Sequence, residues 1–198
     1  EYAFPRLRAL LDGHDYAGPQ FNMTIGEPQH LYPLWIKDVL FEHLDGFNRY
    51  PANDGIEKLQ ISIVNWFHKR FGVKLASDKN ILPLNGTREG LYNVSMALCP
   101  ERLSDRVPFV LIPNPFYQVY MISALSVNSE PLFIPTDEKS GHFPDYLGLK
   151  ADVLNNTSAA YICSPSNPQG AVATAEYLTA LIELAEKYDF IIFADECY

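Results

Sequence analysis

The sequence has few cysteines, no paired histidines and no long apolar run, and each absence excludes a class of protein. The three cysteines, Cys99, Cys163 and Cys197, are odd in number and widely spaced, so we expect buried thiols rather than a disulfide framework or a zinc knuckle. The five histidines lie singly, which predicts no metal site. No segment has the length and hydrophobicity of a membrane span, and the first residues lack the regions of a signal peptide. We therefore expect a cytoplasmic protein without a membrane partner.

Basic residues are also scarce, because 15 Lys and Arg stand against 24 Asp and Glu, for a net charge of −9. Proteins that bind nucleic acid usually carry a basic face, so we expect no nucleic-acid partner. The charge balance still allows a local anion site made of backbone amides. With 198 residues, 47% of them hydrophobic, the chain can form a core, and its length suits one domain or one domain plus part of another.

What the sequence does contain is an alternation of apolar runs and helical patterns. The first fifty residues, broken by prolines and glycines, predict an arm of loops with one short helix at about 34–44. Helical spacing then predicts a helix near 56–71, with Gly72 as its stop. Further helices are predicted at about 85–99, 115–127 and 174–188, the last capped by Thr174, and strands at 80–84, 107–112, 131–135, 159–163 and 190–194. This alternation predicts a three-layer α/β/α fold with a mostly parallel sheet.

Ligands of such folds bind beyond the carboxyl ends of the strands. After 80–84, Gly86, Thr87 and Arg88 open a helix whose free amides and dipole favour an anion. After 107–112, Tyr117 offers a ring for stacking on a planar ligand. The ordinary alternatives are a turn capped by Thr87 and simple core packing of the ring.

Two further strand ends carry polar groups. Asn167 follows 159–163 and precedes a proline, so its amide is held away from helical geometry. Asp195 directly follows 190–194, where a buried carboxylate is costly unless it is paired. The alternatives are a plain Asn-Pro turn and a solvated surface loop. Together the four strand ends suit one flat, phosphorylated heteroaromatic ligand.

Six segments share the order and intervals of a known family. They are "IGEP" at 25–28, "RYPANDGIEKL" at 49–59, "NGTREGL" at 85–91, "PNPFYQVY" at 113–120, "SPSNPQG" at 164–170 and "ADECY" at 194–198. Over essentially its whole length, the chain resembles the N-terminal part of a fold type I, pyridoxal 5′-phosphate (PLP)-dependent aminotransferase of classes I and II. The narrower resemblance is to the succinyldiaminopimelate aminotransferases of bacterial lysine and peptidoglycan synthesis.

The resemblance implies a role for each candidate residue toward PLP. Asp195 would pair with the pyridinium nitrogen and keep the ring an electron sink, and with Tyr198 it is the expected catalytic residue. Asn167 and Tyr198 would bond the phenolic oxygen, and Tyr117 would stack on the ring. The phosphate cup would consist of Gly86, Thr87 and Arg88.

The resemblance also implies roles for two of the first fifty residues. Tyr50 would reach the phosphate of a neighbouring subunit, which implies a homodimer, and Gly26 would lie over the substrate carboxylate. Residues 1–50 would form the N-terminal arm and part of a small domain, and 51–198 the first part of the PLP-binding large domain. The family's Schiff-base lysine would lie beyond Tyr198, so we expect part of a longer enzyme that is inactive alone.

The implied activity moves an amino group between an amino acid and a 2-oxo acid, and the narrower resemblance implies N-succinyl-diaminopimelate with 2-oxoglutarate. Gln60, Gln169 and Cys197 depart from the family's usual residues without removing a ligating group. Two alternatives stay open: a PLP-dependent lyase of the same fold, and a non-catalytic domain that binds or regulates. A nucleotide-binding oxidoreductase is disfavoured, because no G-x-G-x-x-G follows the first strand.

Overall fold

The computed structural model describes residues 3–14, 17–19, 21, 23, 26, 28 and 30–198, and the chain divides into two units, Glu1–Ala52 and Asn53–Tyr198. The first unit contains helix α1 (Ala3–Leu11), helix α2 (Trp35–Glu42) and a short 3-10 helix, Leu44–Asn48. Helix α2 confirms the short helix expected near 34–44. The other two helices lie where only loops were expected.

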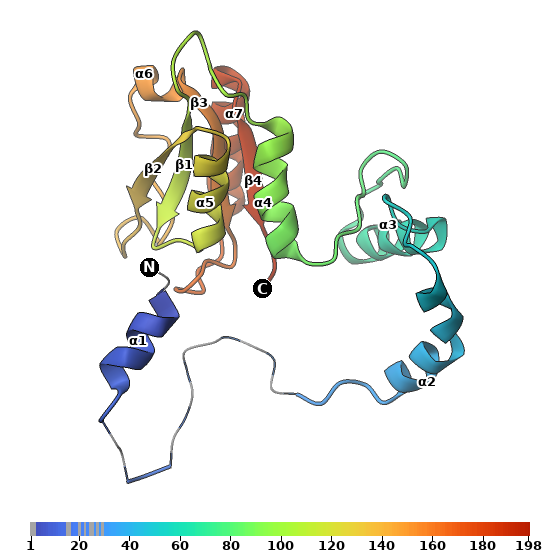
Figure 1. Cartoon of the computed structure of the whole chain (residues 1–198). Helices are drawn as coiled ribbons and strands as arrows, with labels where there is room; N and C mark the ends of the chain where they lie inside the picture. The colour runs from blue at the N-terminus through green and yellow to red at the C-terminus, as the bar shows by residue number, and fades with distance from the viewer. Residues whose placement is uncertain are drawn as a thin grey trace. The chain divides into compact units, whose positions relative to one another are not determined.

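The second unit opens with helix α3 (Glu57–Phe71), as the apolar spacing predicts (Figure 1). Gly72 ends it in the left-handed region at φ 71°, where a residue without a Cβ has no steric penalty, and its N–H bonds the carbonyl of His68. The predicted stop is therefore confirmed.

The core of the second unit is a four-stranded sheet in which all neighbouring strands are parallel, in the order β2-β1-β3-β4 (Figure 1). The strands are β1 (Phe109–Asn114), β2 (Glu130–Pro135), β3 (Thr157–Cys163) and β4 (Ile191–Asp195). The helices around them are α4 (Thr87–Leu98), α5 (Gln118–Ser126), α6 (Ala151–Leu154) and α7 (Ala175–Tyr188). Four of the five predicted strands and every predicted helix are confirmed, and α6 is an addition.

Alternate side chains of each strand enter two separate cores. On one face Leu111, Ala160 and Ile162 pack with Leu154 of α6 and Leu181 of α7. On the other face Val110, Ile112, Ala159, Tyr161 and Phe193 pack with Tyr120 and Ala124 of α5, and Leu91 and Val94 of α4 lie against them. Because both faces of the sheet are covered, the strands read as continuous apolar runs. This is the three-layer arrangement expected from the sequence.

The predicted strand at 80–84 is wrong, since these residues form no regular structure. A strand requires a hydrogen-bonded neighbour, and no described strand pairs with this segment. Leu82 and Leu84 are exposed and instead line a cavity whose other wall is β4. Pro83, which has no N–H, further weakens pairing at this place.

Helix α7 begins as predicted, with Thr174 in the cap position. The Thr174 hydroxyl accepts a hydrogen bond from the Tyr177 N–H at 3.2 Å. This satisfies one of the amide groups that the first turn of a helix leaves without a partner.

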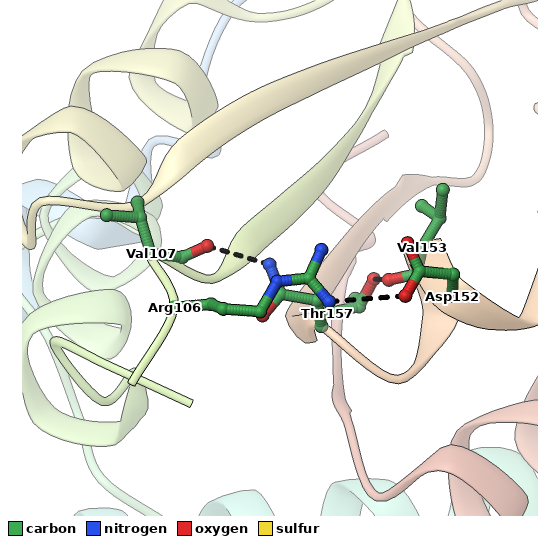
Figure 2. Close-up of polar contacts among 6 residues, drawn as sticks. Arg106, Val107, Asp152, Val153 and Thr157 are labelled. Carbon is green, nitrogen blue, oxygen red and sulfur yellow. Dashed lines mark hydrogen bonds and ion pairs between the residues drawn. The ribbon is translucent and has the colours of Figure 1, made fainter. Parts of the chain in front are cut away.

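Polar contacts connect the segments at the amino ends of β1 and β3, the edge of the sheet opposite the candidate site (Figure 2). Arg106 Nη1 lies 3.2 Å from Asp152 Oδ1, and the Thr157 hydroxyl donates to the Val153 carbonyl at 2.9 Å. Asn156 Nδ2 donates to the Val107 carbonyl at 2.7 Å. These contacts tie the segment before β1 to α6 and the start of β3. The Arg106–Asp152 pair is solvent-exposed, so it contributes little to stability.

The three cysteines are all free thiols, as expected, but they differ in burial. Cys163 is buried, Cys99 is half-buried and Cys197 is exposed, which corrects the expectation of uniform burial. None of the helices in the described part of the chain has the length and hydrophobicity that a bilayer crossing requires.

Candidate functional site

Asp195 is the last residue of β4 and lies at the carboxyl edge of the sheet, paired in register with Cys163 of β3. It follows Phe193 by two residues, so its side chain projects on the same face, toward α4 and α5. Only 5% of the residue is exposed. The sequence alternative of a solvated loop acid therefore does not hold for Asp195, whereas the neighbouring Glu196 is exposed.

The Asp195 carboxylate has neutral partners. The Tyr120 hydroxyl donates to Oδ2 at 2.5 Å, and the Cys197 N–H donates to Oδ1 at 3.4 Å. Among the described residues, the one ion pair is Arg106–Asp152, so no described cationic side chain neutralises Asp195. A buried carboxylate without a cation is unfavourable on its own. The site is therefore suited to a ligand that brings a positive charge.

Tyr120 is the residue at this edge that the sequence did not single out. It is 1% exposed and stacks on Tyr161, with ring centroids 4.4 Å apart and an interplanar angle of 14°. Burial, and then the hydrogen bond and charge of Asp195, raise the pKa of Tyr120 far above its usual value. The hydroxyl therefore stays protonated at neutral pH and acts as the donor in its bond to Asp195.

Asn167 and Tyr198, far apart in the sequence, meet beside this strand end. Asn167 Nδ2 donates to the Tyr198 hydroxyl oxygen at 3.0 Å. This bond leaves the Tyr198 hydroxyl proton available for a further acceptor. Burial, followed by the nearby Cys197, Cys163 and Asp195, raises the pKa of Tyr198, so this proton is retained at neutral pH.

The N-terminus of α4 presents backbone amides without side-chain partners. Gly86 is the cap residue, with an extended backbone at φ 174°, and no side chain caps the first turn. Thr87 is the first helical residue, which corrects the alternative that it caps the turn. Arg88 Nε donates to the Tyr117 hydroxyl at 2.6 Å, and this bond links the helix start to the loop after β1. Free amides beside a guanidinium favour an anion.

One cavity connects the helix start with the carboxylate. Its volume is about 720 Å³, and its wall includes Thr87, Leu91 and Val94 of α4 and Phe193 and Asp195 of β4. The structure thus places the predicted anion site and the predicted cation acceptor on one hollow. Tyr117 lies close to both, since it contacts Arg88 and packs edge-on against Tyr120 with centroids 5.8 Å apart.

Two predicted residues belong to the other unit. Gly26 and Tyr50 are both exposed within Glu1–Ala52, and their roles toward substrate and partner subunit stay predictions. Of the "IGEP" segment, Ile25 and Glu27 lie outside the described residues. In the described part of the chain, no group of three or more His, Cys, Asp or Glu side chains is arranged to hold a metal ion.

The donor set fits the cofactor that the resemblance implies. A carboxylate without a cation suits a protonated ring nitrogen, and a helix N-terminus suits a phosphate. The Asn167 amide and the Tyr198 hydroxyl suit an anionic ring oxygen, and Tyr117 offers the aromatic face.

Comparisons with known proteins point the same way. The family described as Aminotransferase class I and II matches residues 19–198. An LL-diaminopimelate aminotransferase from Dehalococcoides mccartyi is 32% identical over 179 residues, covering 89% of this chain and 45% of that protein.

Solved structures give a similar result. A Neisseria meningitidis aminotransferase has a TM-score of 0.90 at 31% identity, and a Helicobacter pylori aminotransferase has 0.89 at 33%. Each is matched along 100% of this chain, which covers 50% and 51% of their lengths. The chain thus spans about half the length of the relatives it matches.

Proposed function

The chain belongs to the class I and II aminotransferase family, and on that premise we propose that it forms the N-terminal half of a PLP-dependent transaminase. Members of this family depend on PLP. The observation that carries the proposal is Asp195, a buried carboxylate without a described cation on the same cavity as the free N-terminus of α4. One ligand with a cationic ring nitrogen and an anionic tail satisfies both ends.

The chemistry divides between the cofactor and the protein. When bound, PLP supplies an electron sink that stabilises negative charge at the substrate α-carbon. Asp195 keeps a proton on the ring nitrogen through its negative charge, which preserves that sink. Asn167 and Tyr198 donate hydrogen bonds at the phenolic oxygen. The amides of Gly86 and Thr87, with Arg88, hold the phosphate and so fix the ring in register with Asp195.

Tyr117 completes the binding of the ring. Its hydroxyl accepts from Arg88, so its orientation is tied to the phosphate end of the site. We propose that its ring covers one face of the cofactor and excludes water there. The domain division stays part of the proposal, with residues 1–50 as arm and small-domain segment and 51–198 as the first part of the cofactor domain.

We propose a diaminopimelate derivative as amino donor and 2-oxoglutarate as acceptor. The succinyldiaminopimelate resemblance favours the N-succinylated donor, whereas the name of the Dehalococcoides relative favours free LL-diaminopimelate. The active unit in this proposal is a homodimer in which Tyr50 of each subunit reaches the other subunit's phosphate. Its mass in solution, measured by light scattering, tests the dimer.

The activity test uses the full-length protein with PLP. Each donor is incubated with 2-oxoglutarate, and glutamate formation is measured. Glutamate formed with either donor supports a transaminase and identifies the substrate. Release of ammonia or a thiol without any 2-oxo acid would instead indicate a lyase. Cofactor binding without turnover of any amino acid would indicate a non-catalytic binding domain.

A further inference from the structure

We propose that Tyr120 is a positioning residue that holds Asp195 charged and aimed at the ring nitrogen of PLP; this inference rests on the proposed function. In this proposal Tyr120 acts through Asp195, to which its hydroxyl donates. The two residues are 75 positions apart in the sequence and meet because α5 packs on the face of the sheet toward which Asp195 projects.

The Tyr120–Asp195 contact has the geometry of a strong hydrogen bond. The oxygen atoms lie 2.5 Å apart, which is typical of a hydroxyl bonded to a charged carboxylate. Both residues are almost fully buried, so water competes little for either group.

The position of the Tyr120 hydroxyl is set by packing. One face of its ring stacks on Tyr161, and the ring of Tyr117 meets it at 87°. Tyr161 is itself fixed, because its hydroxyl donates to the Leu91 carbonyl at 2.7 Å and lies 2.8 Å from the hydroxyl oxygens of Ser95 and Ser123. The donor is thus pre-organised before any ligand binds.

This arrangement restricts Asp195 to one orientation. Oδ2 accepts from Tyr120 and Oδ1 accepts from the Cys197 N–H, so rotation of the carboxylate would break both bonds. Each oxygen retains lone pairs for a further donor.

The bond also controls where a shared proton lies. Hydrogen bonds donated to a carboxylate stabilise its charged form. When a carboxylate faces a ring nitrogen, the added donor therefore favours the state with the proton on nitrogen. Without the Tyr120 hydroxyl, the proton moves toward the carboxylate, and the ring loses part of its positive charge.

The test uses full-length apoprotein and 4′-deoxypyridoxine 5′-phosphate, which has the ring and the phosphate of PLP but cannot form a Schiff base. Tyr120→Phe removes the hydroxyl and keeps the ring that stacks on Tyr161. Tyr146→Phe is the matched control, because Tyr146 is equally buried and its hydroxyl donates to the Tyr161 carbonyl at 2.7 Å on the other face of the sheet.

Two quantities are measured: the dissociation constant of the probe, and the ¹⁵N chemical shift of its ¹⁵N-labelled ring. We expect Tyr120→Phe to raise the dissociation constant about tenfold, which corresponds to about 1.4 kcal/mol. The ring nitrogen shift should move toward its unprotonated value in Tyr120→Phe, and Tyr146→Phe should match the wild type in both quantities. A purely structural role would not move the nitrogen shift.

If Tyr120→Phe binds the probe like the wild type with the nitrogen equally protonated, the inference is wrong. Failure of the wild type to bind the probe would instead contradict the proposed function.

A second measurement needs only the wild-type protein, so it tests the inference even if Tyr120→Phe does not fold. The Tyr120 hydroxyl proton, in a short bond to a carboxylate, should give a downfield ¹H resonance that shifts when the probe binds. An unchanged resonance would likewise refute the positioning role.

Discussion

Replacing Asp195 by Asn removes one negative charge from the candidate site while keeping the shape of the side chain. Two unit charges about 4 Å apart attract by about 4 kcal/mol at an effective dielectric constant of about 20. Asp195 is already buried, so folding has removed its carboxylate from water, and the remaining desolvation cost falls on the ligand. We expect about half of the attraction, about 2 kcal/mol, to appear in binding, which is about a thirtyfold increase in the dissociation constant.

The assay is a titration of full-length apoprotein with PLP, followed by the change in cofactor absorbance. Asp152→Asn is the matched control, since its carboxylate is exposed on α6 and its partner is Arg106. We expect this control to bind PLP like the wild type. A dissociation constant for Asp195→Asn within threefold of the wild-type value would refute the role assigned to the charge.

Three further predictions concern the stability of the second unit, measured by urea unfolding of the full-length protein. Thr174→Ala removes the N-cap of α7 and should lower the free energy of unfolding by about 1 kcal/mol. The control, Thr179→Ala on the exposed surface of the same helix, should not lower it. Ala160→Leu overfills the core and should lower the free energy of unfolding by about 1–3 kcal/mol. The control is Ala151→Leu at an exposed position, whose free energy of unfolding should lie within about 0.5 kcal/mol of the wild-type value. Burial raises the pKa of four tyrosines in the folded protein: Tyr120, Tyr146, Tyr161 and Tyr177. As the pH rises, the unfolded chain therefore loses these protons before the folded chain does. The free energy of unfolding should be constant with respect to these groups below about pH 10 and should fall above it. Each contributes a slope of about 1.4 kcal/mol per pH unit, which the corresponding Phe variant should remove, and an unchanged slope would contradict burial of that hydroxyl.

The sequence predicted the sheet well because its strands are buried on both faces. Continuous apolar runs such as Val110–Ile112 and Ala159–Cys163 have few other stable environments, and Gly72 and Thr174 mark helix ends through local geometry. The failure at 80–84 has the opposite cause. An apolar run becomes a strand only beside a partner, and partners are set by tertiary structure, which local pattern does not contain.

The candidate residues were chosen where a residue type itself signals chemistry at a strand end. Asp195, Asn167 and Tyr117 were selected in this way; they lie at or just after the ends of β4, β3 and β1, and their roles toward PLP stay predictions. Tyr120 was missed because in the sequence it is one more aromatic residue of an apolar helix. Its proposed positioning role depends on one contact with Asp195 across 75 positions, which spacing along the chain does not reveal.

The most direct test is a crystal structure of the full-length protein with PLP bound. We predict the ring nitrogen within roughly 2.7–2.9 Å of an Asp195 carboxylate oxygen, with the phosphate against the amides of Gly86 and Thr87. A ring nitrogen turned away from Asp195, or a phosphate bound elsewhere than the start of α4, would contradict the account.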